Sequence, residues 1–227
     1  MKTLIMIPLQ KELDAFVQGC QSHQVQISNG AIGRLQATHL PDLDITLACG
    51  GLGKAQFGVQ TQHLIDIGPA WDMVLCAGAA GGMNDMVKVG DVVIGVETVE
   101  HDINNRFGPP RLPKFAADQT MLDSFKKVTL PEANFSIHYG SIASGDEDIV
   151  DLDRRAALVQ LTQSIACAWE GAGGARACQF SQIPFMEIRG ITDGADNTAA
   201  ADFKTNLGFA MHNLALTIIN WSRQASS

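Results

Sequence analysis

The sequence predicts an α/β fold built on a mostly parallel sheet, because short apolar runs alternate with helical periodicity and glycine-rich turns follow several of the runs. The apolar runs predict buried strands at residues 4–7, 45–48, 73–75, 91–98, 137–144 and 184–191. Helices are expected over 9–17, over a stretch ending at 67, and over 158–168. A closing helix is predicted over 207–221, where apolar residues recur at steps of four and three.

Length and charge narrow the class of protein. The 227 residues, 46% of them hydrophobic, suit one large domain spanning 1–227 with a sizeable core. The 24 acidic and 16 basic residues give a formal charge of −8, which argues against nucleic-acid partners and anionic membrane surfaces. No apolar run approaches the about 20 residues that span a bilayer. The N-terminal segment lacks a signal-peptide cleavage site and is expected to be the first strand.

The cysteines predict neither a disulfide framework nor a zinc site. Their number is odd and no two form a C-x-x-C pair, so buried reduced thiols are expected, which favours the cytoplasm. Histidine spacing suggests no metal site either. The five cysteines are Cys20, Cys49, Cys76, Cys167 and Cys178.

One segment, 104–114, has the composition of a loop. Pro109 and Pro110 exclude it from a helix or a central strand. A surface excursion is the favoured interpretation, and a lid over a site is the alternative.

Two glycine-rich segments are candidates for ligand contact. Residues 78–82 follow a predicted strand, where glycine lets a ligand approach the backbone; a tight turn packed against a helix is the alternative, and the signal alone is weak. Residues 51–53 are a weak dinucleotide signal, since Gln56 stands where the third glycine of G-x-G-x-x-G belongs.

Three carboxylates stand near predicted strand ends. Asp193 ends an apolar strand, where it serves either chemistry or a turn cap. Glu170 lies among small and apolar residues, so it needs a ligand or a partner such as Arg176 or Arg189. Glu12 begins a helix, and taken alone it is better explained as a solvated acid in the first turn.

Six short motifs follow one another in a fixed order along the chain. They are Gly50-Gly51-Leu52-Gly53-Lys54, Gly78-Ala79-Ala80-Gly81-Gly82 with Val89-Gly90-Asp91-Val92-Val93, Glu100-His101-Asp102, Ser144-Gly145-Asp146, Trp169-Glu170-Gly171-Ala172 and Arg189-Gly190-Ile191-Thr192-Asp193-Gly194-Ala195-Asp196. With these motifs the chain resembles the nucleoside phosphorylase superfamily, most of all its methylthioadenosine/S-adenosylhomocysteine nucleosidase branch, over nearly its whole length. The resemblance implies a single α/β domain around a twisted mixed sheet that partly closes into a barrel, flanked by helices, in a homo-oligomer.

The resemblance also implies a reaction, cleavage of the N-ribosidic bond of a purine nucleoside without a metal or cofactor. By this resemblance Asp193 holds a proton near the purine N7, which requires a pKa raised by burial. Glu12 activates the attacking water, and Glu170 accepts hydrogen bonds from the ribose 2′ and 3′ hydroxyls. Gly78 and Ala79 are expected to contact the substrate.

Water is favoured over phosphate as the attacking group. The phosphorylases that resemble this chain carry a Gly-Asp-Pro-type loop where this sequence has 7–12, and Glu12 there would repel phosphate. Ala79 replaces the serine common in the family, which removes a hydroxyl donor. Lys11 and the arginines of the 104–114 segment keep a phosphorylase as the alternative.

The substrate is less closely defined. Asp148 stands where the nucleosidases have an aromatic residue that stacks on the base, and the backbone of Ile149 matches the group that reads the purine edge. Trp169 replaces the usual methionine beside the ribose, or else simply fills core volume. Other 5′-substituted nucleosides, such as futalosine or adenosylhopane, therefore stay open. A nucleoside-binding protein without turnover is the rival from another class.

Overall fold

The computed structural model describes residues 1–108, 111–130 and 133–225. In this part of the chain the strands form one mixed sheet in the order β10-β6-β8-β9-β5-β1-β4-β3-β2, and β7 pairs with β6. The strands are β1 (Thr3–Ile7), β2 (Ser28–Ile32), β3 (Leu35–Leu40), β4 (Ile45–Cys49), β5 (Met73–Gly82), β6 (Val92–Glu100), β7 (Lys114–Ala116), β8 (Ile137–Ser144), β9 (Ala166–Ala168) and β10 (Phe185–Asp193). The helices are α1 (Gln10–Ser22), α2 (Gly53–Ile67), α3 (Gln119–Phe125), α4 (Leu152–Thr162), α5 (Gly171–Ser181) and α6 (Ala199–Ala225), with a 3-10 turn η1 (Pro41–Leu43).

The sheet closes on itself at one end. Strand β10 pairs with β5 as well as with β6, so β5, β9, β8, β6 and β10 form a five-stranded barrel. The remaining strands β1, β4, β3 and β2 extend the sheet outward from β5. The predicted mixed sheet, partly closed into a barrel and flanked by helices, is confirmed.

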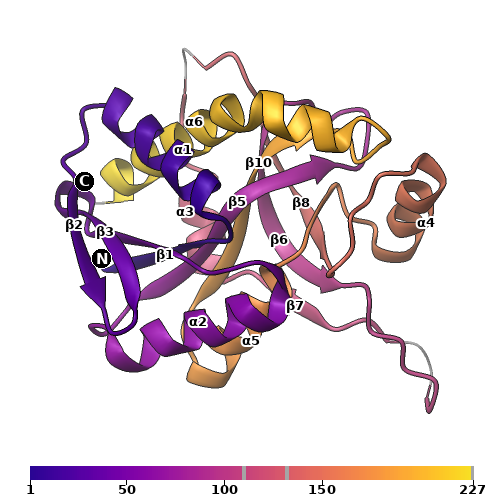
Figure 1. Cartoon of the computed structure of the whole chain (residues 1–227), viewed down its shortest axis with the longest axis horizontal. Helices are drawn as coiled ribbons and strands as arrows, with labels where there is room; N and C mark the ends of the chain where they lie inside the picture. Colours follow the sequence, from indigo (N-terminus) through magenta and orange to yellow (C-terminus); the bar gives the residue numbers. More distant parts are fainter. Residues whose placement is uncertain (109–110, 131–132, 226–227) are drawn as a thin grey trace.

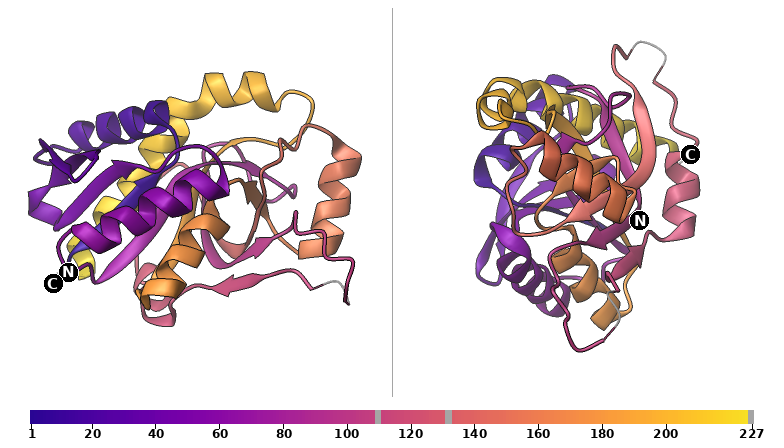
Figure 2. Two further views of the ribbon diagram at one scale, coloured as in Figure 1. Left: turned by 60° about the horizontal axis from the view of Figure 1, so that its bottom comes forward. Right: turned by 90° about the vertical axis from the view of Figure 1, so that its right-hand side faces the viewer.

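Helices cover both faces of the open part of the sheet. Helices α1 and α6 lie along one face, and α2 and α5 lie side by side on the other (Figure 1, Figure 2). Side chains alternate between these faces along β1: Ile5 and Ile7 join the core under α1 and α6, whereas Leu4 and Met6 join the core under α2 and α5. Such strands are buried on both faces, which explains why they are continuous apolar runs in the sequence.

Two predicted elements differ from the structure. The helix expected over 158–168 begins earlier, as α4, because Asp151 accepts a hydrogen bond from the Arg154 amide at 2.9 Å and caps it. It ends where Gln163 takes a left-handed conformation, φ 57°. Residues 166–168 form strand β9 instead, which inserts between β8 and β5.

The glycine-rich segment 78–82 is also not the predicted turn. It continues β5, since its residues pair with β10 along one edge and with β9 along the other. The closing helix is confirmed and is longer than expected. Along α6 the apolar stripe of Met211, Leu214, Ile218 and Trp221 is buried.

Two further observations concern the state of the cysteines and the length of the helices. All five cysteines are free thiols, and Cys49 alone among them is only partly buried. Within the described ranges, no helix combines the length and the apolar character needed to cross a membrane.

Candidate active site

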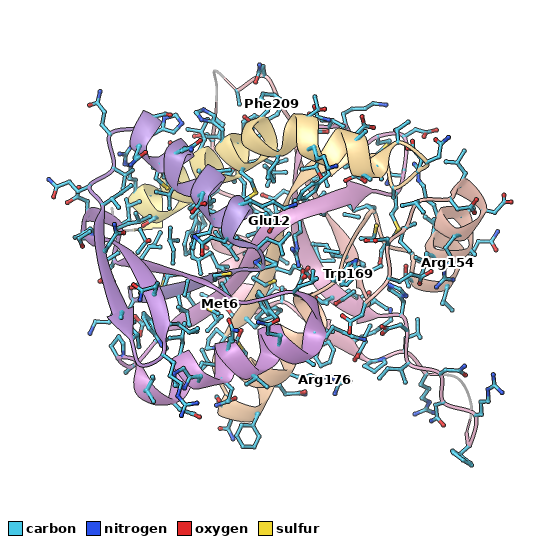
Figure 3. All side chains as sticks on the ribbon, viewed as in Figure 1. Met6, Glu12, Arg154, Trp169, Arg176 and Phe209 are labelled. Atoms are coloured by element: carbon cyan, nitrogen blue, oxygen red, sulfur yellow. The ribbon has the colours of Figure 1, made fainter. Side chains whose placement is uncertain are left out.

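A cavity of about 430 Å³ opens at the carboxyl ends of β1 and β10 and along the second half of β5. This is the edge at which parallel sheets place their ligands. Figure 3 shows Glu12, at the start of α1, and Trp169, after β9, near the centre of the molecule, and both line this cavity. The predicted site residues that line it are Glu12, Ala79, Asp148, Ile149, Trp169, Glu170 and Asp193.

Glu12 lies in the first turn of α1 and is not solvated. Its side chain faces inward, only 4% of the residue is exposed, and its Oε2 atom has no hydrogen-bond partner among the described residues. Burial raises the pKa of Glu12 to about 8, although the nearby Arg189 guanidinium opposes the rise. The interpretation of Glu12 as a solvated helix-start acid is therefore wrong.

Asp193 is the last residue of β10 and both of its oxygens are held. Oδ2 accepts a hydrogen bond from the Thr192 hydroxyl at 2.8 Å, and Oδ1 accepts one from the Ala195 amide at 2.9 Å. Burial nevertheless raises the pKa of Asp193 above its usual range. The carboxyl thus combines a turn-capping contact with a position in the cavity wall, so the two sequence interpretations coexist.

Glu170 immediately precedes α5 and is 4% exposed. Its Oε1 accepts a hydrogen bond from the Gly53 amide at 3.3 Å, and its Oε2 lies 3.5 Å from Nη2 of Arg189. Burial is the main cause that raises the pKa of Glu170. The expected ion-pair partner is Arg189, whereas Arg176 pairs with Glu100. Both contacts of Glu170 are long, so its carboxylate can still accept hydrogen bonds from a ligand.

Arg189 organises this wall of the cavity, and the sequence pointed to it only as a partner for Glu170. Arg189 is only 1% exposed, and its Nε donates a hydrogen bond to Oε1 of Glu187 at 2.8 Å. Its Nη1 donates to the Ala79 carbonyl at 3.3 Å. The signal in the sequence was an arginine inside the apolar strand 184–191, since a buried cation requires carboxylate partners.

Ser144 holds the segment that carries Trp169 and Glu170. Its hydroxyl donates to the Trp169 carbonyl at 2.8 Å and accepts from the Ala172 amide at 2.9 Å. Because both bonds involve backbone, they fix the path of the chain rather than one side chain. Trp169 is partly buried and lines the cavity, so it does more than fill core volume.

Asp148 and Ile149 reach the cavity from the segment after β8. The backbone amide of Asp146, just before them, donates to Oδ2 of Asp102 at 2.9 Å. Ile149 packs in the apolar cluster that contains Cys167 and Ala195, next to Asp193. This part of the cavity therefore combines apolar side chains with the carboxylates of Asp148 and Asp193.

Gly78 is the one predicted site residue outside the cavity lining. A Cβ at this position would lie 2.7 Å from Oε2 of Glu12 and 2.9 Å from Nη1 of Arg189. The absence of a side chain therefore makes room for Glu12 and Arg189, and Gly78 shapes the site from behind rather than contacting a ligand.

The described part of 104–114 does not support a lid. None of its described residues lines the cavity, and the segment after β6 extends away from the body of the molecule (Figure 1). A surface excursion fits better, although Pro109 and Pro110, on which that interpretation rested, lie outside the described residues. Within the described ranges, no group of three or more His, Cys, Asp or Glu side chains is arranged to hold a metal ion.

The barrel and the cavity at its strand ends together define a protein with the nucleoside phosphorylase-like α/β fold. The chain belongs to the Phosphorylase superfamily, whose family model matches residues 2–219. It is 30% identical to a 5′-methylthioadenosine/S-adenosylhomocysteine nucleosidase of Shewanella loihica, over 97% of this chain and 98% of the relative. A relative of the same name from Exiguobacterium is 32% identical over 80% of this chain and 81% of its own length.

Solved structures show the same architecture. The nucleosidase of the same name from Neisseria meningitidis, in complex with methylthio-immucillin-A, superposes with a TM-score of 0.83 at 27% identity, covering 99% of this chain and 100% of that one. Futalosine hydrolase of Helicobacter pylori superposes with a TM-score of 0.84 at 23% identity, covering 97% of both chains, a likeness that concerns the fold alone.

Proposed function

We propose that this protein is a purine nucleosidase that hydrolyses the N-ribosidic bond of a 5′-modified purine nucleoside, releasing the free base and the sugar. One observation carries the proposal: Glu12, Glu170 and Asp193, far apart in the sequence, line a single cavity. The names of the Shewanella and Exiguobacterium relatives support the same reaction.

The three acids divide the reaction among them. Breaking the bond from C1′ to the purine leaves positive charge on the sugar and sends the electron pair to the base. Asp193, whose raised pKa favours the protonated form, donates its proton to N7 of the departing purine. Glu12 takes a proton from the water whose oxygen bonds to C1′. With a pKa of about 8, Glu12 has a proton affinity suited to a base near neutral pH.

Glu170 and Arg189 position the sugar. The Glu170 carboxylate accepts hydrogen bonds from the 2′ and 3′ hydroxyls, and the Arg189 guanidinium compensates its charge from the buried side. Arg189 contacts protein groups on each side of its fork, namely Glu187, Glu170 and the Ala79 carbonyl. It therefore acts through Glu170 as a positioning residue.

Water suits this site better than phosphate. Glu12 and Glu170 both line the cavity, and each carboxylate repels an anion when it is ionised. The Arg189 guanidinium is already occupied by protein acceptors. The Nζ atom of Lys11, the cation next to Glu12 in the sequence, lies over the Phe203 ring. A phosphorylase remains the alternative, which a phosphate dependence would establish.

The residues that line the cavity also indicate which purine base the site prefers. Trp169 and Ile149 offer apolar surface to a purine, and the Asp148 carboxylate can accept a hydrogen bond from an exocyclic amino group. This combination favours adenine over hypoxanthine. The 5′ group stays open between methylthioadenosine-like and other substituted nucleosides, including futalosine.

A panel of purine nucleosides, assayed with and without phosphate, tests the proposal. We expect free base, measured by chromatography, to be released at the same rate in both buffers, with sugar rather than ribose 1-phosphate as the second product. Asp193→Asn should lower kcat by at least about a hundredfold. Asp196→Asn is the matched control, because that exposed carboxylate instead accepts a hydrogen bond from Thr198.

Each rival predicts another result. Ribose 1-phosphate formed only with phosphate would identify a phosphorylase. A nucleoside that binds without any release of base would identify a binding protein and contradict the hydrolase.

We also propose a homo-oligomer located in the cytoplasm. Exposed apolar side chains near the cavity mouth and the segment after β6, such as Phe107, Val150 and Leu152, support an association of copies. The five free thiols support a reducing compartment. Light scattering of the purified protein and fractionation of cells test these two points.

A further inference from the structure

The Glu187 carboxylate lies behind the wall of the cavity. Glu187 stands in β10, two residues before Arg189, so both side chains point to the same face of the strand. The side chain of Glu187 is fully buried, and the residue is not part of the cavity lining. Because a charged carboxylate without partners is costly in such a place, the contacts of Glu187 indicate what it does there.

Three groups hold this carboxylate in one place. Its Oε2 accepts a hydrogen bond from the Thr98 hydroxyl of β6 at 2.6 Å, and its Oε1 accepts one from Nε of Arg189 at 2.8 Å. The third group is the backbone of Gly171, where a Cβ would lie only 2.0 Å from Oε2. The missing side chain at the start of α5 therefore makes room for Glu187 directly beside the residue that follows Glu170.

Glu187 and Glu170 share the cation of Arg189 unequally. The contact with Glu187 has the length of a charge-assisted hydrogen bond, whereas Nη2 of Arg189 lies 3.5 Å from Oε2 of Glu170. The bond that Glu170 accepts from the Gly53 amide is also long, at 3.3 Å. An arginine can bind one carboxylate through two short parallel bonds, which would occupy the lone pairs of Glu170. In this structure Nε of Arg189 is bonded to Glu187 instead.

We propose that Glu187 is a positioning residue for the sugar: it holds the Arg189 guanidinium back from Glu170, which leaves the Glu170 oxygens free for the ribose 2′ and 3′ hydroxyls. This inference rests on the proposed function and adds to the same site a residue that touches no ligand. Glu170 stays near enough to Arg189 for charge compensation, yet its oxygens are not saturated. Without the Glu187 charge the guanidinium is drawn toward Glu170, and the ribose then competes with it for the same oxygens.

The rival explanation is that the pair of Glu187 and Arg189 only stabilises the barrel. The two explanations differ in whether the damage depends on the ribose hydroxyls. A role that acts through Glu170 matters for a sugar that bonds to Glu170 and matters less for a sugar that lacks a hydroxyl. A loss of folded protein lowers the rate for every substrate by the same factor.

Glu187→Gln separates the two explanations, because the amide keeps the shape and can bond to both Arg189 and Thr98 while the charge is removed. The substrates are 5′-methylthioadenosine and its 2′-deoxy analogue. We expect kcat/KM to fall at least about tenfold for the ribonucleoside and no more than about threefold for the analogue. In a crystal structure of the variant, the distance from Nη2 of Arg189 to Oε2 of Glu170 should shorten from 3.5 Å to about 2.8 Å.

A milder pair of variants serves if Glu187→Gln does not fold. Thr98→Val removes the hydrogen bond to Oε2 of Glu187 but keeps the charge, and Thr98→Ser keeps the hydroxyl. We expect Thr98→Val to show the same dependence on the 2′ hydroxyl to a smaller extent, and Thr98→Ser to behave like the unmodified enzyme. Glu97→Gln on the same strand is the matched control, because that carboxylate pairs with the exposed Lys114 and should leave both rates unchanged.

Equal losses for the two substrates, in Glu187→Gln or in Thr98→Val, would show that the pair only stabilises the fold and would overturn the inference. An unchanged distance from Arg189 to Glu170 in the crystal structure would overturn it too, and this distance decides even where the analogue is cleaved too slowly to measure. In both cases the nucleosidase stands. If the unmodified protein cleaves neither substrate, the proposed function fails, and the role of Glu187 in positioning the sugar fails with it.

Discussion

The Nη2 atom of Arg189 lies 3.5 Å from Oε2 of Glu170, in a place where the two side chains are only 1% and 5% exposed. The same guanidinium donates to Glu187 at 2.8 Å and lowers the pKa that burial raises at Glu12. One buried cation thus supports three carboxyl groups, two of which line the cavity. Because these acids have little contact with water, the stability of the site depends on this cation.

Replacing Arg189 should therefore be far more damaging than replacing an exposed arginine. Arg189→Met leaves buried carboxylates uncompensated, and we expect it to lower the free energy of unfolding by about 3–5 kcal/mol. Arg176→Met removes the half-exposed partner of Glu100 and should cost at most about 1 kcal/mol. Urea unfolding of both variants measures the difference, and equal losses would contradict a structural role for the buried cation.

Gly78 should matter through Glu12. The methyl group of Gly78→Ala would displace Oε2 of Glu12 or Nη1 of Arg189, so we expect kcat to fall at least about tenfold with a smaller change in KM. Gly208→Ala in α6 is the matched control, because a Cβ there meets no atom within 4 Å. That change should leave kcat unaltered and stabilise the helix by about 0.5–1 kcal/mol. Equal kinetics for both variants would show that Gly78 does not shape the site.

Glu12 should make stability depend on pH. Its pKa is about 8 in the folded protein and near 4.5 when unfolded, so its ionisation disfavours the folded state. The destabilisation is absent below pH 4.5, grows as pH rises, and is complete above pH 8. Glu12→Gln removes it, and we expect the variant to be more stable than the unmodified protein at pH 9, by about 2–5 kcal/mol, yet nearly equal at pH 4. Thermal unfolding at the two pH values measures this, and a difference that does not change with pH would count against the raised pKa.

Much of the fold could be predicted from the sequence, because the central parallel strands are buried on both faces. Strands β1 and β4 fall within one residue of their predicted ends. Helix α5 could not be predicted, since its Gly171-Ala172-Gly173-Gly174 start is typical of a turn. The structure gives the reason for these small residues: a Cβ on Gly173 would lie 2.2 Å from the Lys54 carbonyl of α2, so the two helices pack too closely for side chains there.

Part of the candidate site could be predicted, because burying a carboxylate without a partner costs free energy and an acid in an apolar stretch therefore indicates a ligand or an ion pair. Glu170 and Asp193 stand in stretches that are apolar in the sequence itself. For Glu12 the local sequence predicts a solvated side chain, and only the family resemblance predicts a place in the site. The pairing of Arg189 with Glu170 was one of two predicted alternatives, but the contacts of Arg189 with Glu187 and the Ala79 carbonyl could not be predicted, because they depend on the pairing of β10 with β5. The same holds for the contact of Lys11 with Phe203, which joins residues 192 positions apart.

Trp169 offers a direct signal of ligand binding. It lines the cavity, whereas Trp71 and Trp221 are buried in the core at 8% and 1% exposure. A purine against its ring should change its fluorescence emission, and Trp169→Phe should abolish the change, while Trp71→Phe should keep it. A signal that survives in Trp169→Phe would place the ligand elsewhere.

The proposed function depends most on Glu12, Glu170 and Asp193 acting on one bound nucleoside. A crystal structure of the Asp193→Asn variant with 5′-methylthioadenosine tests this most directly. We expect the side chain of residue 193 within hydrogen-bonding distance of the purine N7, Glu170 bound to the 2′ and 3′ hydroxyls, and Glu12 facing C1′ with room for one water. A nucleoside bound outside this cavity, or bound with Glu12 turned away from C1′, would contradict the account.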